Sequence, residues 1–120
     1  MILRLHHVQI TIPKGAEADA RAFYLGLLAL QEVEKPEPLQ GRGGFWIQLG
    51  DQQVHVGAED GVDRAKTKAH LAYQVDDVRA WRARLEANGV EIGDSVPIPG
   101  FERFEFRDPF GNRVEFLSRE

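Results

Sequence analysis

Leu5-His6-His7-Val8-Gln9-Ile10-Thr11-Ile12 is the stretch that decides the fold, because a similar stretch returns in the second half of the chain. Ala69-His70-Leu71-Ala72-Tyr73-Gln74-Val75 also has a histidine near the start of a strand-like run, and a helical pattern follows both stretches. His7 and His70 are 63 residues apart, about half of the 120-residue chain. A repeat of this length predicts two copies of one supersecondary unit.

The segments after each histidine stretch follow the same predicted order of strand, helix and three strands. In the first half, we expect an amphipathic helix from residue 16 to about residue 28 and strands at 3–12, 31–35, 45–49 and 53–56. In the second half, we expect a helix that Asp76 or Asp77 caps and Asn88-Gly89 ends, and strands at 69–75, 90–92, 103–106 and 113–117. The sequence therefore predicts an α+β fold of two βαβββ modules, at about residues 1–57 and 68–120, within one domain spanning 1–120.

The composition limits the class of protein. With 42% hydrophobic and 28% charged residues, the chain has the make-up of an ordinary globular protein. It contains no cysteine, which excludes disulfides and thiolate ligands. The formal charge of −4 and the scattered basic residues argue against a nucleic-acid partner. The longest apolar run, residues 23–30, is too short to span a membrane, and the start lacks the pattern of a signal peptide. We therefore expect a cytoplasmic protein without a nucleic-acid or membrane partner.

The alternation of side chains along the predicted strands places four metal-competent residues on the sheet faces away from the helices. The neighbours of each of these residues in its strand are mostly apolar and must face the covering helix. The four residues are His7, His55, His70 and Glu115. His55 and Glu115 are 60 residues apart, close to the spacing of the first histidine pair, so the repeat and the alternation agree. His6 falls on the helix side and is not expected to be a ligand.

These residues resemble the vicinal oxygen chelate superfamily, which includes glyoxalases, bleomycin resistance proteins and extradiol dioxygenases. The resemblance covers essentially the whole chain and rests on His7-Val8-x-Ile10-x-Ile12, Ala22-Phe23-Tyr24, His70 and Asp108-Pro109-x-Gly111-Asn112-x-Val114-Glu115. It implies a cup-shaped mixed sheet with the helices outside, a divalent metal inside, and a homodimer that often shares each metal site between subunits. By position, His7, His70 and Glu115 match the two histidines and the terminal glutamate of the family. His55 stands where glyoxalases carry a glutamate or glutamine.

Three imidazoles and one carboxylate suit zinc, nickel, cobalt, iron or manganese better than calcium or magnesium. Four protein ligands would leave two positions of an octahedral metal for a substrate with two neighbouring oxygens, and the metal would act as a Lewis acid. This favours a glyoxalase-like isomerase, lyase or hydrolase. Without His55, the remaining three ligands would form the 2-His-1-carboxylate set of an Fe(II) dioxygenase. A third alternative is a non-catalytic ligand-binding protein of the drug-resistance type.

Further candidates follow from the same alternation. Phe104 and Phe106 are expected to face the helix. Arg103 and Glu105, which alternate with them, are then on the same side of the sheet as Glu115. Arg103 could hold a carboxylate or phosphate of the substrate, and Glu105 could act as a general base beside the metal ligand Glu115. The alternative is that Arg103 and Glu105 simply pair with each other. Trp46 and Gln48 lie on the first hairpin, where they could bound the substrate pocket or pack in a dimer interface.

Overall fold

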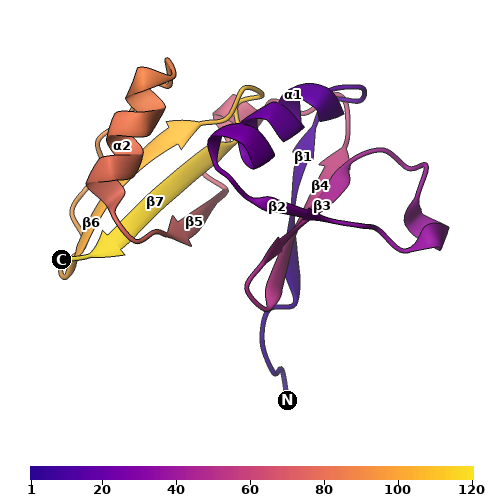
Figure 1. Cartoon of the computed structure of the whole chain (residues 1–120), viewed down its shortest axis with the longest axis horizontal. Helices are drawn as coiled ribbons and strands as arrows, with labels where there is room; N and C mark the ends of the chain where they lie inside the picture. Colours follow the sequence, from indigo (N-terminus) through magenta and orange to yellow (C-terminus); the bar gives the residue numbers. More distant parts are fainter. The chain divides into compact units, whose positions relative to one another are not determined.

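Two small mixed sheets, one in each half of the chain, form the framework of this computed structural model, which describes residues 1–120 (Figure 1). The chain divides into a first unit of residues 1–62 and a second unit of residues 63–120. Each unit has its own sheet and its own helical segment. None of the helices is both long and apolar enough to cross a membrane.

The first unit has a four-stranded sheet in the order β1-β4-β3-β2. Strand β1 runs parallel to β4, whereas β3 is antiparallel to both of its neighbours. The elements in chain order are β1 (His7–Ile12), α1 (Glu17–Arg21), a π-helix (Ala22–Leu27), β2 (Gln31–Val33), a 3₁₀ turn (Glu37–Leu39), β3 (Phe45–Leu49) and β4 (Gln52–Ala58). The parallel pair at one edge and the hairpin beside it give the sheet its mixed character.

The second unit repeats this arrangement with one strand fewer. Its three-stranded sheet has the order β5-β7-β6, with β5 parallel to β7 and β6 antiparallel to β7. The elements are a 3₁₀ turn (Arg64–Lys66), β5 (His70–Gln74), α2 (Val78–Ala87), β6 (Phe101–Arg107) and β7 (Arg113–Arg119). The α+β fold class is confirmed: in both units the first strand crosses over a helix to pair in parallel with the last strand.

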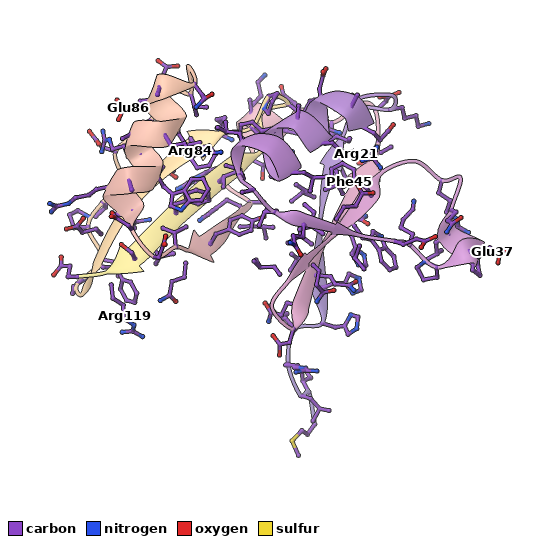
Figure 2. All side chains as sticks on the ribbon, viewed as in Figure 1. Arg21, Glu37, Phe45, Arg84, Glu86 and Arg119 are labelled. Carbon is purple, nitrogen blue, oxygen red and sulfur yellow. The ribbon has the colours of Figure 1, made fainter.

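Alternating side chains divide each sheet into an apolar face and a polar face. In the first unit, Val54 and Val56 on β4 are buried, as are Phe45 and Ile47 on β3. Arg21 joins the helical segment to this sheet, because its guanidinium lies 4.7 Å from the centre of the Phe45 ring (Figure 2) and pairs with Glu32 on β2 at 2.9 Å. The helical segment therefore lies over the side of the sheet that carries Phe45.

In the second unit, α2 lies along β6 and β7. Asp77 caps its N-terminus, since the carboxylate accepts hydrogen bonds from the backbone N–H groups of Arg79 and Ala80, both at 3.1 Å. The helix ends in a Schellman motif at Gly89, where φ is 81° and Val90 N–H donates to Leu85 O at 3.0 Å. The capping residue and the stop predicted from the sequence are both confirmed.

The expected strand at 90–92 is wrong, and the reason is this helix end. The N–H group of Val90 is used by the Schellman motif, and the first residue after the helix that pairs with β6 is Gly93, which forms a bridge with Glu105. The two backbone hydrogen bonds of the bridge measure 2.7 and 3.1 Å. A single bridge thus occupies the position at the edge of the second sheet that β2 occupies in the first.

Two boundaries in the first unit also differ from expectation. The helix predicted to about residue 28 is α-helical only to Arg21 and then widens into a π-helix, in which Leu28 N–H donates to Phe23 O at 2.9 Å. The wider turn re-aims the side chains that follow it, and Phe23, Tyr24 and Leu28 are all buried. Strand β1 begins at His7 rather than at residue 3, because its partner β4 begins at Gln52 and its last backbone hydrogen bond on this side is from Gln53 N–H to His6 O at 3.3 Å.

Candidate metal-binding residues

The polar face of the first sheet brings His7 and His55 together. His55 lies on the central strand β4, directly opposite Gln9 of β1, and His7 is two residues before Gln9 on the same face. The two imidazole rings are stacked, with their centres 4.1 Å apart and their planes 16° apart. The predicted pairing of these two histidines in one module is therefore present in the structure.

His55 is held between neighbours on both sides. Trp46, opposite it on β3, stacks on its ring with a centroid distance of 3.8 Å and an interplanar angle of 1°. His55 Nε2–H donates to Gln53 Oε1 at 2.9 Å, and Gln53 in turn donates to Gln48 Oε1 at 3.0 Å. These hydrogen bonds fix the proton on Nε2 and leave the lone pair on Nδ1, which is the form of a neutral imidazole that binds a metal.

The pKa of His55 is lowered from 6.5 to about 4, mainly because the residue is buried and to a smaller extent because of the nearby charges of His7 and His6. Only 7% of the His55 surface is exposed, which agrees with the loss of hydration as the main cause. His55 is therefore neutral at pH 7 and does not have to lose a proton before it binds a metal.

The stability of the metal-free protein should depend on pH through His55. Between pH 6.5 and about 4, the unfolded chain holds a proton on this residue that the folded chain does not, so the free energy of unfolding falls as the pH is lowered through this range. Urea unfolding at a series of pH values measures this slope. We expect a shallower slope for His55→Gln and an almost unchanged slope for His6→Gln, whose side chain is exposed. Equal slopes for His55→Gln and the parent protein would contradict the assignment.

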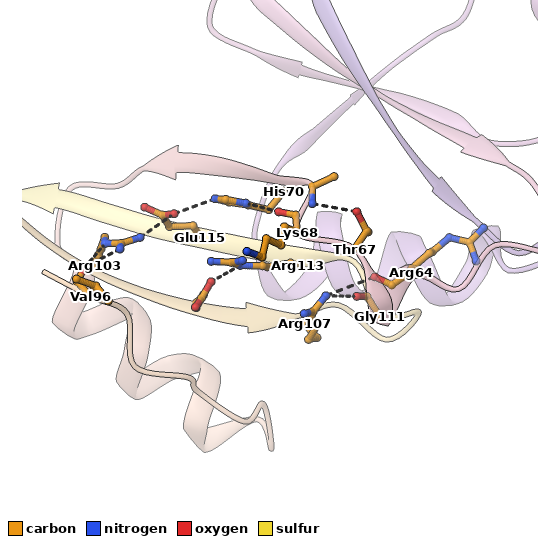
Figure 3. A network of polar contacts seen from close by, with 12 residues as sticks. Arg64, Thr67, Lys68, His70, Val96, Arg103, Arg107, Gly111, Arg113 and Glu115 are labelled. Atoms are coloured by element: carbon orange, nitrogen blue, oxygen red, sulfur yellow. Dashed lines mark hydrogen bonds and ion pairs between the residues drawn. The ribbon is translucent and has the colours of Figure 1, made fainter. Parts of the chain in front are cut away.

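The polar face of the second sheet brings His70 and Glu115 together (Figure 3). His70 Nε2 lies 3.0 Å from Glu115 Oε1, and the other ring nitrogen, Nδ1–H, donates to Lys68 O at 2.8 Å. Glu115 is only 4% exposed, although it is a carboxylate. A backbone carbonyl thus orients the imidazole, and Nε2 is the nitrogen that faces the carboxylate.

Arg103 and Glu105 lie on β6, on the same face as Glu115, but they do not pair with each other. Arg103 Nη1 forms an ion pair with Glu115 Oε1 at 3.1 Å, and the same guanidinium donates hydrogen bonds to Val96 O in the preceding loop. Glu105, which stands opposite Glu115 in the sheet register, forms an ion pair with Arg113 instead (Figure 3). Arg103 therefore compensates the buried charge of Glu115, while Glu105 is engaged by a cation that the sequence analysis did not consider.

The two pairs occupy equivalent positions in the two sheets. In the first sheet, the residue two places after His7 is opposite His55, and in the second sheet the residue two places after His70 is opposite Glu115. Each unit contributes two metal-competent side chains, and within neither unit does the structure gather three or more His, Cys, Asp or Glu side chains suited to a metal. The repeat therefore places one pair at equivalent register positions of each sheet, called a half-site below: two stacked imidazoles in the first unit, and an imidazole facing a carboxylate in the second.

The donor chemistry of both half-sites fits a divalent transition metal. Two ligands about 2.1 Å from a metal and at right angles lie about 3.0 Å apart, which matches the separation of His70 Nε2 and Glu115 Oε1. His55 and His70 each have one ring nitrogen held by an oxygen acceptor of their own unit, as metal-binding histidines usually do. His7 Nδ1 lies 3.0 Å from His6 Nδ1, so Nε2 is the ring nitrogen of His7 that is left for a metal.

Two polar residues at these half-sites were not singled out from the sequence. Gln53 orients His55, and the signal for it was present, because it precedes His55 by two residues and so shares its face of β4. Arg113 neutralises Glu105 across the β6–β7 pair. The register partner of Arg113 is Arg107, and Glu105 lies two positions before Arg107 on β6. No sequence pattern indicates that contact, since it depends on the register that the hairpin adopts.

Comparison with known proteins identifies the family. A sequence model described as the Glyoxalase/Bleomycin resistance protein/Dioxygenase superfamily matches residues 4–116. A comparison with curated protein sequences gave no match. Among solved structures, a protein of Bacillus anthracis assigned to the glyoxalase family is 39% identical and has a TM-score of 0.92, with 100% of this chain and 98% of that chain covered.

Two further structures share the fold at lower identity. Lactoylglutathione lyase from Agrobacterium tumefaciens is 22% identical with a TM-score of 0.73, and the match covers 96% of this chain and 92% of that chain. The fosfomycin resistance protein FosX from Listeria monocytogenes, solved with Mn(II) and 1S,2S-dihydroxypropylphosphonic acid, is 18% identical with a TM-score of 0.82. That match covers 100% of this chain and 95% of that chain. The family match over nearly the whole sequence shows that the chain belongs to the glyoxalase/bleomycin resistance protein/dioxygenase superfamily.

Proposed function

We propose that this protein is a metal-dependent enzyme that acts on a small substrate with two neighbouring oxygen atoms. The observation that carries the proposal is the repeated register, which gives each sheet one pair of metal-competent side chains on its polar face. The expected reaction is an isomerisation, a lyase reaction or a hydrolysis of the glyoxalase type. In such reactions negative charge develops on an oxygen of the substrate and must be stabilised.

The proposed ligands are His7 and His55 from the first unit and His70 and Glu115 from the second. Three imidazoles and one carboxylate suit zinc, nickel, cobalt, iron or manganese. A bound divalent metal would supply Lewis-acid stabilisation of the negative charge on the substrate oxygen. We further propose that the active form is a homodimer, as the family resemblance implies.

The other residues of the half-sites have positioning roles in this proposal. Arg103 forms an ion pair with Glu115 and donates a hydrogen bond to a loop carbonyl, so it holds the carboxylate in one orientation and offsets the cost of burying its charge. Trp46 stacks on His55 and limits its rotation.

Glu105 is the proposed general base. Its ion pair with Arg113 must open or shift before Glu105 can accept a proton from a substrate.

The position of His55 favours one alternative, an Fe(II)-dependent dioxygenase. Its ring is stacked between those of Trp46 and His7, which is a packing role that needs no metal. If His55 has only this structural role, then His7, His70 and Glu115 remain as a 2-His-1-carboxylate set. The two proposals differ in a measurable way, because a dioxygenase consumes O₂ with its substrate and a Lewis-acid isomerase does not.

Elemental analysis of protein purified without a histidine tag tests the proposed function. We expect about one divalent transition metal per chain, as one four-ligand site requires, and a reduced content in His55→Ala. An unchanged metal content in His55→Ala, together with substrate-dependent O₂ uptake, would support the dioxygenase. Protein that holds no metal even after incubation with Ni²⁺, Zn²⁺, Mn²⁺ or Fe²⁺ would rule out both enzyme proposals.

A further inference from the structure

A cavity of about 420 Å³ lies beside the two histidines of the first unit. Its strand residues include His7, Gln9, Trp46 and His55, and the segment between β2 and β3 contributes Lys35 and Arg42. The volume lies at the small end of the range for ligand sites in proteins. The cavity is thus of a size for a small metabolite and is bordered by two of the proposed metal ligands.

The charge of the cavity differs from the charge of the whole chain. The formal net charge of the protein is −4, but the side chains that line the cavity include two permanent cations, Lys35 and Arg42, and no carboxylate. A concave surface with one sign of charge attracts ligands of the opposite sign. The cavity is therefore suited to an anion, although the protein is acidic.

The local backbone presents both cations to the cavity. Lys35 Nζ donates to Gly43 O at 2.8 Å, which uses one of its three N–H groups and ties the segment together. Gly43 and Gly44 have φ values of 77° and 75°, and a side chain on Gly44 would collide with the carbonyl of Val56 on β4. This close approach requires glycine and holds the segment against the sheet.

Arg42, which precedes these two glycines, is exposed, and its guanidinium makes no hydrogen bond or ion pair within the protein. A guanidinium offers two parallel N–H groups that match the two oxygens of a carboxylate, phosphonate or phosphate. An unpaired arginine at the wall of a cavity, with a partly free lysine beside it, is thus available to a ligand rather than engaged in the fold.

We propose that Lys35 and Arg42 bind an oxyanion group of the substrate, so that the substrate is a small carboxylate, phosphonate or phosphate with two neighbouring oxygens. This assignment of substrate class rests on the proposed function, because the cavity also contains His7 and His55. The indole face of Trp46 forms an apolar wall, which suits a short hydrocarbon portion between the anionic group and the oxygens that would bind a metal held by His7 and His55.

Ligand titrations test the proposal, with Trp46 fluorescence and backbone amide NMR shifts as the readouts. The probes are methylphosphonate, lactate and the neutral amide of lactate, each added to metal-stripped and to Mn²⁺-loaded protein at low salt. We expect the anions to bind and the amide to bind much more weakly. Removal of a charge-assisted hydrogen bond in Arg42→Gln or Lys35→Met should raise the Kd of the anions about 10-fold. A comparison of the Kd values of methylphosphonate and lactate shows whether the site prefers a tetrahedral or a planar anionic group.

Arg4→Gln is the matched control, because it removes the same charge from an exposed residue of the first unit outside the cavity, where Arg4 pairs only with Asp51. It should leave the Kd unchanged. Equal anion binding by Arg42→Gln, Lys35→Met and the parent protein, or equal binding of the amide and lactate, would overturn the proposal.

Metal binding is measured separately on the same variants by calorimetry. Metal binding without any effect of Lys35 or Arg42 on the anions would refute the oxyanion site and leave the proposed function standing. Loss of anion binding in Arg42→Gln and Lys35→Met, in a protein that binds no metal, would establish the oxyanion site and refute the proposed metal enzyme.

Discussion

Replacement of Glu115 by glutamine is expected to lower the affinity for a divalent transition metal by at least about 100-fold, the upper end of the loss seen for partners outside the ligand shell. Glutamine has nearly the same shape, so its side-chain oxygen can still lie beside the Arg103 guanidinium in this buried position. It lacks the negative charge that makes the carboxylate a strong ligand. Calorimetric titration of chelator-treated, tag-free protein with Ni²⁺ or Mn²⁺ measures the change.

Glu105→Gln is the matched control for this experiment. Glu105 stands directly opposite Glu115 on the neighbouring strand and undergoes the same chemical change, but its carboxylate pairs with Arg113 rather than with a histidine. We expect its metal affinity to stay within about 3-fold of the parent value, since it is not a ligand in the proposal. An affinity that is unchanged in Glu115→Gln, or lost equally in both variants, would contradict the assignment of Glu115.

Replacement of Phe116 by alanine should produce the largest loss of stability in the second unit, about 3–5 kcal/mol. Phe116 is 3% exposed, and its ring lies within 6.0 Å of four other aromatic rings, those of Tyr73, Trp81, Phe104 and Phe106. Its removal leaves a cavity with aromatic walls that cannot close without moving two strands and a helix. Domains of this size have a total stability of about 5–15 kcal/mol, so the variant is close to unfolding.

Urea unfolding followed by tryptophan fluorescence and by circular dichroism measures this loss. Phe101→Ala is the control, because Phe101 lies on β6, is only half-buried and contacts the guanidinium of Arg119 with its ring. We expect a clearly smaller loss there. A free energy of unfolding for Phe116→Ala that equals that of Phe101→Ala would show that the aromatic cluster does not carry the stability of this unit.

The alternation of side chains predicted much of the fold from the sequence. Val54 and Val56 are buried on one side of β4, and His55 lies on the other with His7, as a period of two requires. The same rule placed Glu115 beside His70 in the second sheet. These positions were predictable because each strand has one apolar face, and a shift by one residue would bury the polar side chains instead.

Other features depend on contacts that no local pattern records. The π-helix after Arg21 arises from how Phe23, Tyr24 and Leu28 fit the core, not from a helical period. The strand expected at 90–92 is an exception, because a local contact displaces it: the helix end indicated by Asn88-Gly89 uses the N–H group of Val90. The positions of Arg42 and Lys35 at one cavity follow from three-dimensional loop geometry. The π-helix and the cavity therefore follow from tertiary contacts, which local propensity does not determine.

The parallel pairing of the first and last strands in each unit also determines the order in which the structure can form. The β3–β4 and β6–β7 hairpins join strands that are close in sequence, so they close at little entropic cost. Strands β1 and β5 must cross a helix to reach their partners, and such non-local pairings form late. His7 reaches His55, and His70 reaches Glu115, only in this last step. A metal bound by these side chains would bind only chains that have completed folding. It would therefore slow unfolding, because it would hold together the strand pairs that would separate first.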